Sequence, residues 1–389
     1  MLAITNAKIM TMADRVIENG TILIDGKKIV AVDAGLTIPE GAEVIDAKGR
    51  LTTPGLVDPH SHIGIGEEGI GKEGQDYNEV SNPVTPQMRA IDAIYPDDKG
   101  FLQARQAGVT SVVTGPGSAN CIGGSFVALK TFGRRVDDMV IKNPVAMKMA
   151  FGENIKRVYG SKDQAPTTRM GIAALIRENL LKAKQYMLKK EHGEQPDYNI
   201  QYEALIPVLK GQLTVKAHAH RTDDIFTAIR IAKEFGLKMT LDHCTEGHLI
   251  ADLLAGEPYA AICGPNLTSA SKYETRNRSF TTPAALYREG VKLAIMTDNS
   301  VVPTAQLPLC AGLACRSGLP EEEAFKAITI HAAEITGIGD RVGSLEVGKD
   351  ADLVIWTKNP VKDVDCQAAI TIIDGHPVYR MDEDEKFGF

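Results

Sequence analysis

The segment LTVKAHAHRTDDIFTAIRIAKEFGLKMTLDH, residues 213–243, contains one complete strand–helix–strand unit. The apolar runs LTVKAH and KMTLDH at its two ends have the length and composition of buried strands. Between them, TDDIFTAIRIAKEFG begins with Thr222 as the expected N-cap before an acidic first turn, and it stops at Gly236 as a helix should. The segment therefore predicts two parallel strands joined by a crossover helix.

The same alternation extends in both directions over residues 53–342. Further strand-like runs are GLVDPH, VTSVVTG, VAMKMA, AAICG and VKLAIMTD, and helix-like segments such as 168–190 and 282–290 lie between them. Repeated units of this kind form either a closed (β/α)8 barrel or an open doubly wound sheet. Because seven or eight units are present and no strand is followed by G-x-G-x-x-G, we expect the α/β fold of a (β/α)8 TIM barrel. The third strand is expected within 125–141, and 64–98 form a Gly- and Pro-rich excursion.

The two ends of the chain have a different pattern. Residues 1–52 contain short strand-like runs separated by Gly, Asn and Asp, as in hairpins. Residues 343–389 are similar, with ADLVIWTK and AAITIIDGHPVYR as strands and a turn at Asp374-Gly375. We therefore expect 1–52 and 343–389 to pair into one small β-sandwich domain, and 53–342 to form the barrel.

Composition limits the partners and the cellular location. The 43 Lys and Arg against 50 Asp and Glu give a net charge of −7, which argues against nucleic acid or an anionic membrane as partner. The start of the chain lacks the apolar core of a signal peptide, and no run approaches the ~20 apolar residues of a membrane span. The six cysteines are scattered without a C-x-x-C pair, as is typical of reduced thiols. We expect a cytoplasmic enzyme that forms a homo-oligomer.

Polar residues with metal-binding chemistry stand at the C-terminal ends of the predicted strands. In a (β/α)8 barrel these ends meet on one face, where catalysis takes place. We therefore expect residues that are far apart in the sequence to converge there. Histidine with carboxylate ligands suits Zn, Mn, Fe or Ni, and no set of thiolate ligands is present to favour a softer site. The residues are His60, Lys148, His218, His243 and Asp298.

Two H-x-H motifs each offer a pair of imidazoles. His60 and His62 follow the first strand, and His218 and His220 follow LTVKA. Both rings of a pair could turn toward one ion where the strand ends, but either pair taken alone could also be surface or hydrogen-bonding histidines. From the second pair we expect His218 to bind metal, with His220 lining the substrate pocket or supporting a ligand.

Lys148 and Asp298 are unusual because each ends an apolar strand. A lysine in this position is costly unless it is paired, so it could reach solvent or pair with Glu153. Alternatively, a lowered pKa would free its amine to react with carbon dioxide, and the resulting carbamate could bridge two metals. Asp298 follows LAIMT, where a carboxylate needs a partner. It either caps the next helix or binds a metal.

Taken together, these motifs resemble the amidohydrolase superfamily of metal-dependent hydrolases, and more narrowly the proteins related to imidazolonepropionase. The matching segments are TTPGLVDPHSHIG at 52–64, VKAHAHR at 215–221, TLDHCTEGH at 240–248, LAIMTDNS at 293–300, and 328–356. The resemblance implies a distorted barrel beside a small β-sandwich and one or two divalent ions, with zinc the expected metal. It implies one metal on His60, His62 and Asp298, and a second on His218 and His243, bridged by a carboxylated Lys148. Asp298 would then act as base and acid toward an activated water.

One departure from the family pattern bears on the reaction. Deaminases of this superfamily, and imidazolonepropionase itself, carry a Glu three residues after the histidine of the fifth strand, where this chain has Arg221. We therefore expect hydrolysis of a C–N amide bond in a cyclic amide, an N-acyl amino acid or a dipeptide-like molecule. A mononuclear deaminase of a heterocyclic amine and an inactive barrel that serves as a binding partner are the alternatives.

Basic side chains near the predicted strand ends suggest a small substrate that carries a carboxylate. The fork of Arg221 could clamp such a group. Taken singly, each of these side chains could be a solvated surface group, but together they favour an anionic substrate. The residues predicted to contact it are His220, Arg221, Arg157 and Tyr159; Lys156 also follows the fourth strand, and Arg276 and Arg278 lie in the loop after the seventh.

Overall fold

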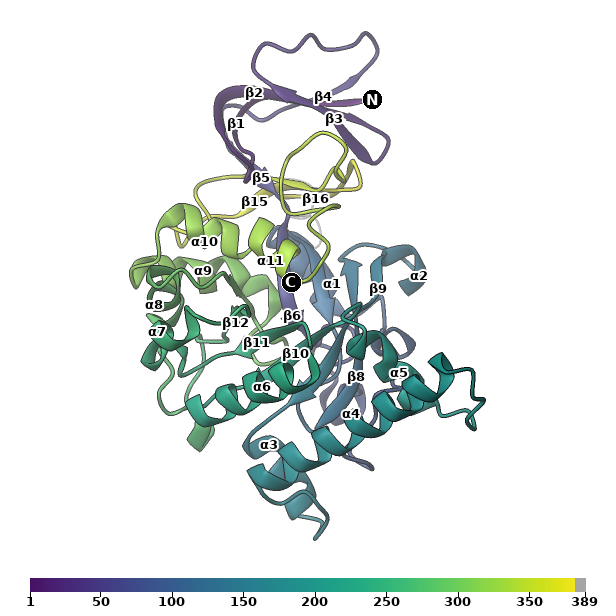
Figure 1. Cartoon of the computed structure of the whole chain (residues 1–389). Helices are drawn as coiled ribbons and strands as arrows, with labels where there is room; N and C mark the ends of the chain where they lie inside the picture. Colours follow the sequence, from purple (N-terminus) through teal and green to yellow (C-terminus); the bar gives the residue numbers. More distant parts are fainter. Residues whose placement is uncertain (382–389) are drawn as a thin grey trace.

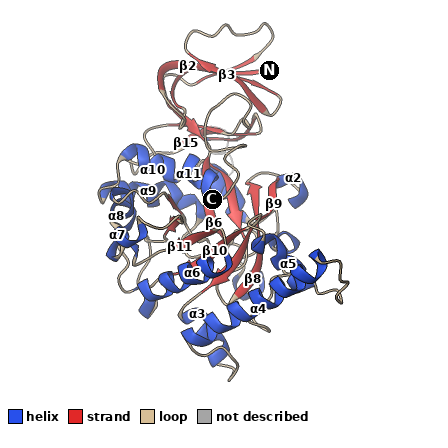
Figure 2. Cartoon of the chain, viewed as in Figure 1, coloured by secondary structure: helices blue, strands red, loops and turns tan. Residues whose placement is uncertain are grey.

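The computed structural model describes residues 1–381, which form two β-sheets surrounded in part by helices (Figure 1, Figure 2). The larger sheet has eight strands in sequence order. They are β6 (Leu56–Ser61), β7 (Val109–Thr114), β8 (Ile122–Lys130), β9 (Val140–Ala150), β10 (Thr214–Ala219), β11 (Met239–His243), β12 (Ala260–Cys263) and β13 (Leu293–Ile295).

The helices of the larger part lie mainly outside this sheet (Figure 2). They are α1 (Lys99–Gln106), α2 (Val136–Met139), α3 (Glu153–Gly160), α4 (Arg169–Glu191), α5 (Ile200–Leu209), α6 (Thr222–Phe235), α7 (Ala251–Leu254), α8 (Thr282–Arg288), α9 (Leu307–Arg316), α10 (Glu321–Ala327) and α11 (Ile330–Ile335). Short 3-10 turns occur at η1 (Gly71–Gly74), η2 (Ala90–Ala93), η3 (Gly247–Leu249), η4 (Tyr273–Thr275) and η5 (Thr304–Gln306). Among residues 1–381, none of these helices has the length and apolar composition that crossing a bilayer requires.

The predicted unit at 213–243 is confirmed. β10 and β11 are parallel, and α6 connects them before ending at Gly236, which takes the left-handed conformation with a φ of 67°. The cap at the start of α6 differs from the prediction. Arg221 occupies the N-cap position, and the N–H of Thr222 donates to Oε2 of Glu246 at 2.9 Å. A glutamate from the β11–η3 loop therefore caps this helix.

The expectation of a wholly parallel sheet is wrong for one strand. β8 runs antiparallel to both β7 and β9, and the other neighbouring pairs are parallel. The third strand also starts earlier than predicted, because β8 begins at Ile122 and the predicted range is 125–141. Gly124 in β8 has a φ of +121°, and a Cβ atom there would lie 2.5 Å from the carbonyl oxygen of Met88. This glycine lets the 64–98 excursion pack directly against the sheet.

The sheet approaches closure into a barrel through backbone hydrogen bonds beyond the end of β13. The N–H of Asp298 donates to the carbonyl of His60 at 3.1 Å, and the N–H of His62 donates to that of Asn299 at 2.7 Å. The end of β6 and the residues after β13 are thereby held together. This closure brings the first and last predicted ligand segments side by side.

The smaller sheet combines both ends of the described chain, above the barrel in Figure 1. β5 pairs with β1 on one side and with β14 on the other. The sheet encloses its own apolar core, which includes Ile4, Ile22 and Leu353. The predicted domain limits stay a prediction, and residues 382–389 of the predicted small domain lie outside the described residues. The strands are β1 (Leu2–Met10), β2 (Val16–Asp25), β3 (Lys28–Asp33), β4 (Glu43–Asp46), β5 (Leu51–Pro54), β14 (Leu353–Trp356), β15 (Ala368–Ile373) and β16 (His376–Arg380).

A buried lysine connects the two sheets. Nζ of Lys130, at the end of β8, lies 3.0 Å from Asp350, 3.4 Å from Asp374 and in contact with Asp352. Burial disfavours the charge of Lys130, but the Asp352 and Asp350 carboxylates outweigh burial and raise its pKa. Three carboxylates of the C-terminal segment are therefore held on one cation of the barrel.

Candidate metal centre

All the predicted ligands lie within or directly after the C-terminal parts of barrel strands, and all are buried. The C-terminal ends of the strands of such a barrel form one face, and these residues lie on it. The predicted convergence is confirmed. The residues and their strands are His60 and His62 with β6, Lys148 with β9, His218 and His220 with β10, His243 with β11 and Asp298 after β13.

A first cluster surrounds the carboxylate of Asp298. Oδ1 of Asp298 lies 3.1 Å from Nε2 of His62 and 3.6 Å from Nε2 of His60. The ligand atoms of His60, His243 and Asp298 all lie within 4.8 Å of one another. Nζ of Lys148 donates to Nε2 of His60 at 3.2 Å, so the amine is at the edge of the same cluster.

A second cluster consists of His218, His220 and His243, whose ligand atoms also lie within 4.8 Å of one another. Burial is the largest cause that holds the pKa of each of these imidazoles well below its ordinary value. Within residues 1–381, both ring nitrogens of His218 and Nε2 of His220 and of His243 have no hydrogen-bond partner. Buried neutral imidazoles with unpartnered nitrogens are costly unless they bind a metal, so these residues fit a divalent ion.

His220 has a larger part in this cluster than the sequence predicts. It was expected to line the pocket or support a ligand, with His218 as the ligand. The structure brings both into one group, and Nδ1 of His220 lies 2.7 Å from Oγ1 of Thr245. His220 is therefore a candidate ligand as well, because its Nε2 is turned toward the other two rings.

Hydrogen bonds on the far side of the rings fix which nitrogen faces the centre. Nδ1 of His62 donates to the carbonyl of Gly115 at 2.6 Å, and Nδ1 of His243 donates to that of Gly264 at 2.8 Å. A carbonyl can only accept, so these Nδ1 atoms carry the hydrogen and leave the Nε2 lone pairs free. This tautomer is the one that binds a metal through Nε2.

His60 is held in the same way by a buried carboxylate that the sequence analysis missed. Nδ1 of His60 contacts Oδ2 of Asp242, which also lies 2.8 Å from Nζ of Lys216. Thr240 donates to Oδ1 of Asp242 at 2.6 Å, and Lys216 donates to the carbonyl of Pro59 at 3.0 Å. A sequence signal was present, since Lys216 stands two residues before His218 and so shares its face of the strand.

We expect Asp242→Asn to weaken metal binding by about 10- to 100-fold, because loss of such a partner frees the ring of His60 and removes the charge opposite Lys216. Competition with a chromophoric zinc chelator on the metal-free protein measures the affinity. Asp252→Asn, the same change at an exposed site of α7, serves as control. Unaltered affinity in a folded Asp242→Asn protein would contradict the prediction.

Lys148 differs from its neighbour Lys216, which pairs with Asp242, because Lys148 makes no ion pair with a carboxylate of residues 1–381. The two lysines face each other in the β9–β10 register, and both are buried. Burial is the main cause that lowers the pKa of Lys148 to about 8. The predicted alternative of an ion pair with Glu153 is not seen in the described part of the chain, since Oε2 of Glu153 accepts the N–H of Glu274 at 3.1 Å. Lys148 is thus the lysine whose amine is available to react.

A second buried carboxylate, Asp58, binds the residue that precedes Asp298. Burial raises the pKa of Asp58 to about 7, and its oxygens accept the hydroxyl of Thr297 and the N–H of His60, the latter at 3.3 Å. Asp298 itself has a φ of 55°, which turns its side chain toward the histidines. The alternative that Asp298 caps the next helix is not supported, because the next helical turn, η5, begins only at Thr304.

Three predicted substrate contacts have other surroundings. Nε and Nη2 of Arg221 each donate to a carboxylate oxygen of Asp223 at 2.9 Å. Arg157 is exposed and donates to Asn154 at 3.3 Å. Tyr159 is buried in the hydrophobic core, where its hydroxyl donates to Oδ1 of Asn120 at 2.5 Å, and its contact with a substrate stays a prediction.

Two loops add residues to the site that the sequence analysis did not identify. The ring of Tyr77, from the 64–98 excursion, stacks on His62 with centroids 5.4 Å apart. Glu274, in η4 after β12, is fully buried, with Oε1 3.7 Å from Nε2 of His220 and 3.5 Å from Nζ of Lys272. Both residues lie in loops, where no periodic pattern indicates which side chains point inward.

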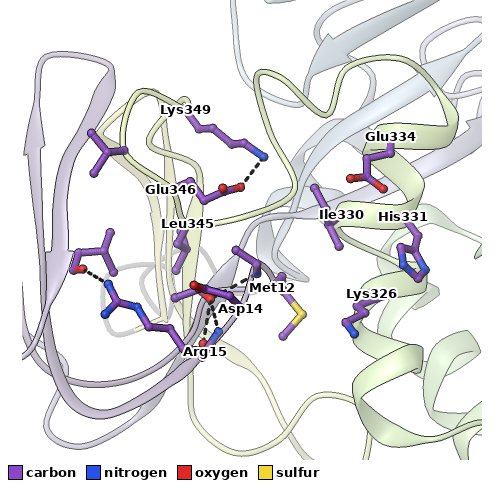
Figure 3. Close-up of a pocket in the computed structure, with 14 residues that line it drawn as sticks. Met12, Asp14, Arg15, Lys326, Ile330, His331, Glu334, Leu345, Glu346 and Lys349 are labelled. Atoms are coloured by element: carbon purple, nitrogen blue, oxygen red, sulfur yellow. Dashed lines mark hydrogen bonds and ion pairs between the residues drawn. The ribbon is translucent and has the colours of Figure 1, made fainter.

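A separate cavity of about 750 Å³ lies between the small sheet and helices α10 and α11 (Figure 3). Its walls carry charged side chains of both signs, including the ion pair of Glu346 with Lys349 at 2.9 Å. None of the clustered ligand residues lines this cavity. This cavity is therefore separate from the candidate metal centre.

Comparison with known proteins identifies the family of the chain. The model of the Amidohydrolase family matches residues 51–378. The chain is 32% identical over 378 residues to amidohydrolase tasK of Hapsidospora irregularis, covering 88% of this chain but only 38% of that protein. It is 30% identical to imidazolonepropionase of Geobacillus kaustophilus (strain HTA426), covering 88% and 84% of the two chains. The solved structure of an amidohydrolase from Thermotoga maritima MSB8 superposes with a TM-score of 0.94 at 40% identity, over 98% of this chain and 100% of that one.

Proposed function

The chain belongs to the amidohydrolase family, and from this premise we propose that it cleaves the amide bond of a small molecule at a centre of divalent metal ions. One observation carries the proposal. Four buried ring nitrogens of His218, His220 and His243 lack hydrogen-bond partners within the described residues. Together with the neighbouring carboxylate of Asp298, they form a donor set suited to metal and otherwise costly to bury.

The proposed metal ligands divide between the two clusters. Bound ions of this kind act as Lewis acids and lower the pKa of water to about 7. Zinc is the expected metal, and iron, manganese or nickel would also suit histidine and carboxylate ligands. We assign His60, His62 and Asp298 to one ion, His218 and His243 with His220 as an additional donor to the other, and Lys148, as a carbamate, to the bridge between them.

Asp298 is the residue we assign to proton transfer. Its carboxylate is at the mouth of the barrel, and its Oδ1 is held 3.1 Å from His62. Burial, followed by the charge of Lys148, keeps the pKa of His60 well below its ordinary value, so that ring is not a proton carrier near neutral pH. Asp298 would accept a proton from the attacking water and deliver it to the leaving nitrogen.

Arg221 supports amide hydrolysis over deamination. It stands where deaminases of the superfamily carry a proton-handling Glu, and its guanidinium is already paired with Asp223. Glu274 provides a carboxylate beside His220, although its Oε2 already accepts the N–H of Glu153 at 2.8 Å. Because this carboxylate is present, we keep the heterocyclic-amine deaminase as the alternative that the experiment must separate from amide hydrolysis.

Metal reconstitution followed by a substrate panel tests the proposal. Metal-free protein is loaded with Zn, Mn, Fe or Ni in bicarbonate buffer and offered N-acyl amino acids, dipeptides, cyclic amides and heterocyclic amines. We expect two ions per chain and release of an amine or a ring-opened acid. One ion with ammonia released from a heterocyclic amine would replace the proposal with deamination. Turnover of no substrate class by the loaded protein would favour a binding role.

A further inference from the structure

We propose that Arg278, in the loop between β12 and α8, forms the subsite that binds a carboxylate of the substrate. This inference rests on the proposed amide hydrolysis and narrows its substrates to amides that carry a carboxylate, such as N-acyl amino acids and dipeptides. It also reassigns the role that the sequence suggests for Arg221.

The guanidinium of Arg278 is fixed on one edge and free on the other. Its Nη1 donates to the carbonyls of Thr268 and Ser269 at 2.7 and 2.6 Å. Its Nε is buried and has no hydrogen-bond partner among residues 1–381. An unpartnered buried N–H is costly, and the Nε–Nη2 edge of a guanidinium matches the two oxygens of a carboxylate. The fixed edge leaves the other edge ready for such an anion.

The charge of Arg278 lies near the metal centre. The loop that carries Arg278 is held at the C-terminal end of β10, where the barrel mouth lies. Nδ2 of the adjacent Asn277 donates to Oε1 of Glu246 at 2.8 Å, and the N–H of Glu246 donates to the carbonyl of His220 at 2.9 Å. Burial lowers the pKa of Arg278, and Asp298 opposes this shift. A substrate anchored here would extend toward the clustered histidines.

The other arginines around the mouth already have partners. Arg221 is paired with Asp223, and Nε of Arg169 lies 3.0 Å from Asp224. Arg276 is exposed and stacks on the ring of Tyr273 at 4.0 Å. Arg278, in contrast, makes no ion pair with a carboxylate within the described part of the chain. It is the cation in this region that a substrate anion would neutralise.

Neutral analogues test this role without relying on turnover. We would measure the dissociation constants of N-acetyl-L-amino acids and of their N-methylamides with the metal-free protein, where hydrolysis does not interfere. The wild type should bind the acids about 10- to 100-fold more tightly than the matching N-methylamides. Arg278→Met should lose this preference, and Arg278→Lys should restore part of it, because lysine keeps the charge but not the fork.

Arg276→Met is the matched control, since it removes an arginine from the same loop that is exposed and already stacked. It should bind acids and N-methylamides as the wild type does. The subsite is overturned if the wild type shows no preference for the acids, or if Arg278→Met weakens acids and N-methylamides equally. Amide hydrolysis without a preference for acids would overturn only the subsite, whereas binding of acids without amide hydrolysis would overturn only the proposed function.

Discussion

Lys148→Ala is expected to retain at most one metal ion per chain and to lose roughly 1,000-fold or more in kcat/KM, since metal activation supplies several kcal/mol to such reactions. The amine of Lys148 is buried, its pKa is lowered to about 8, and it lies 3.2 Å from Nε2 of His60. The proposed carbamate on this nitrogen is the bridge between the two histidine clusters. Without it, the two ions lose their shared ligand.

Metal analysis and chemical rescue measure this effect. Formate or acetate should restore part of the activity of Lys148→Ala, because a small carboxylate can enter the space that the side chain leaves. Lys142→Ala changes an exposed lysine of the same strand and should keep both the ions and the activity. Two ions per chain in Lys148→Ala would contradict the proposal that Lys148 bridges the two metal ions.

The lowered pKa of Lys148 also predicts how metal loading of the wild type depends on pH. A lysine whose folded pKa is about 8 is largely the free amine above that pH and largely protonated below it. Only the free amine reacts with carbon dioxide. Loading in bicarbonate should therefore increase from pH 7 to pH 9, as followed by bound metal. Loading that does not change over this range would contradict the assignment.

Lys130→Met is expected to lower the free energy of unfolding by about 3–5 kcal/mol, because removing one partner of a buried ion cluster leaves uncompensated charge. The side chain of Lys130 is only 5% exposed and holds Asp350, Asp352 and Asp374 at the junction of the two sheets. Methionine fills a similar volume but offers no cation to these carboxylates. The loss should therefore come from electrostatics and not from a cavity.

Urea unfolding compares this variant with Lys27→Met. Lys27 also pairs with Asp374, at 3.0 Å, but its side chain is 68% exposed, so the control should lose no more than about 1 kcal/mol. Similar losses in the free energy of unfolding of the two variants would mean that the buried cluster does not stabilise the junction of the two sheets more than an exposed ion pair does.

The sequence predicts the parallel strands well because each has local signals at both ends, as in the unit from LTVKAH to KMTLDH. The antiparallel direction of β8 depends on the length of a connection. β7 ends at Thr114 and β8 begins at Ile122, which leaves too few residues for the dozen or more that a parallel crossover needs. Placing the third strand within 125–141 hides this short connection. A correct strand start would have indicated the reversal.

The candidate ligands could be predicted for the same reason, since each ends a strand and the barrel brings strand ends together. Residues that contribute to the site only through tertiary contacts could not be predicted from the sequence. Asp242 directly precedes His243 but was not identified, and Glu274 is in a loop with no periodic pattern. Arg221 is predicted to bind a substrate carboxylate because it follows a strand that ends in predicted metal ligands. Its pairing with Asp223, two residues later, was a local contact that the sequence could have suggested.

The order in which the protein can fold follows from the position of β5 in the small sheet. Pro54 in β5 pairs with Leu353 in β14, so β5 cannot complete its pairing until residues about 300 positions later in the chain are present. Such long-range pairings form slowly, and an unpaired strand edge invites association with other chains. During synthesis, β5 exposes one edge until the C-terminal strands leave the ribosome. β5 directly precedes β6, so the strand that carries His60 is joined to a sheet that is complete only after β14 has been synthesised.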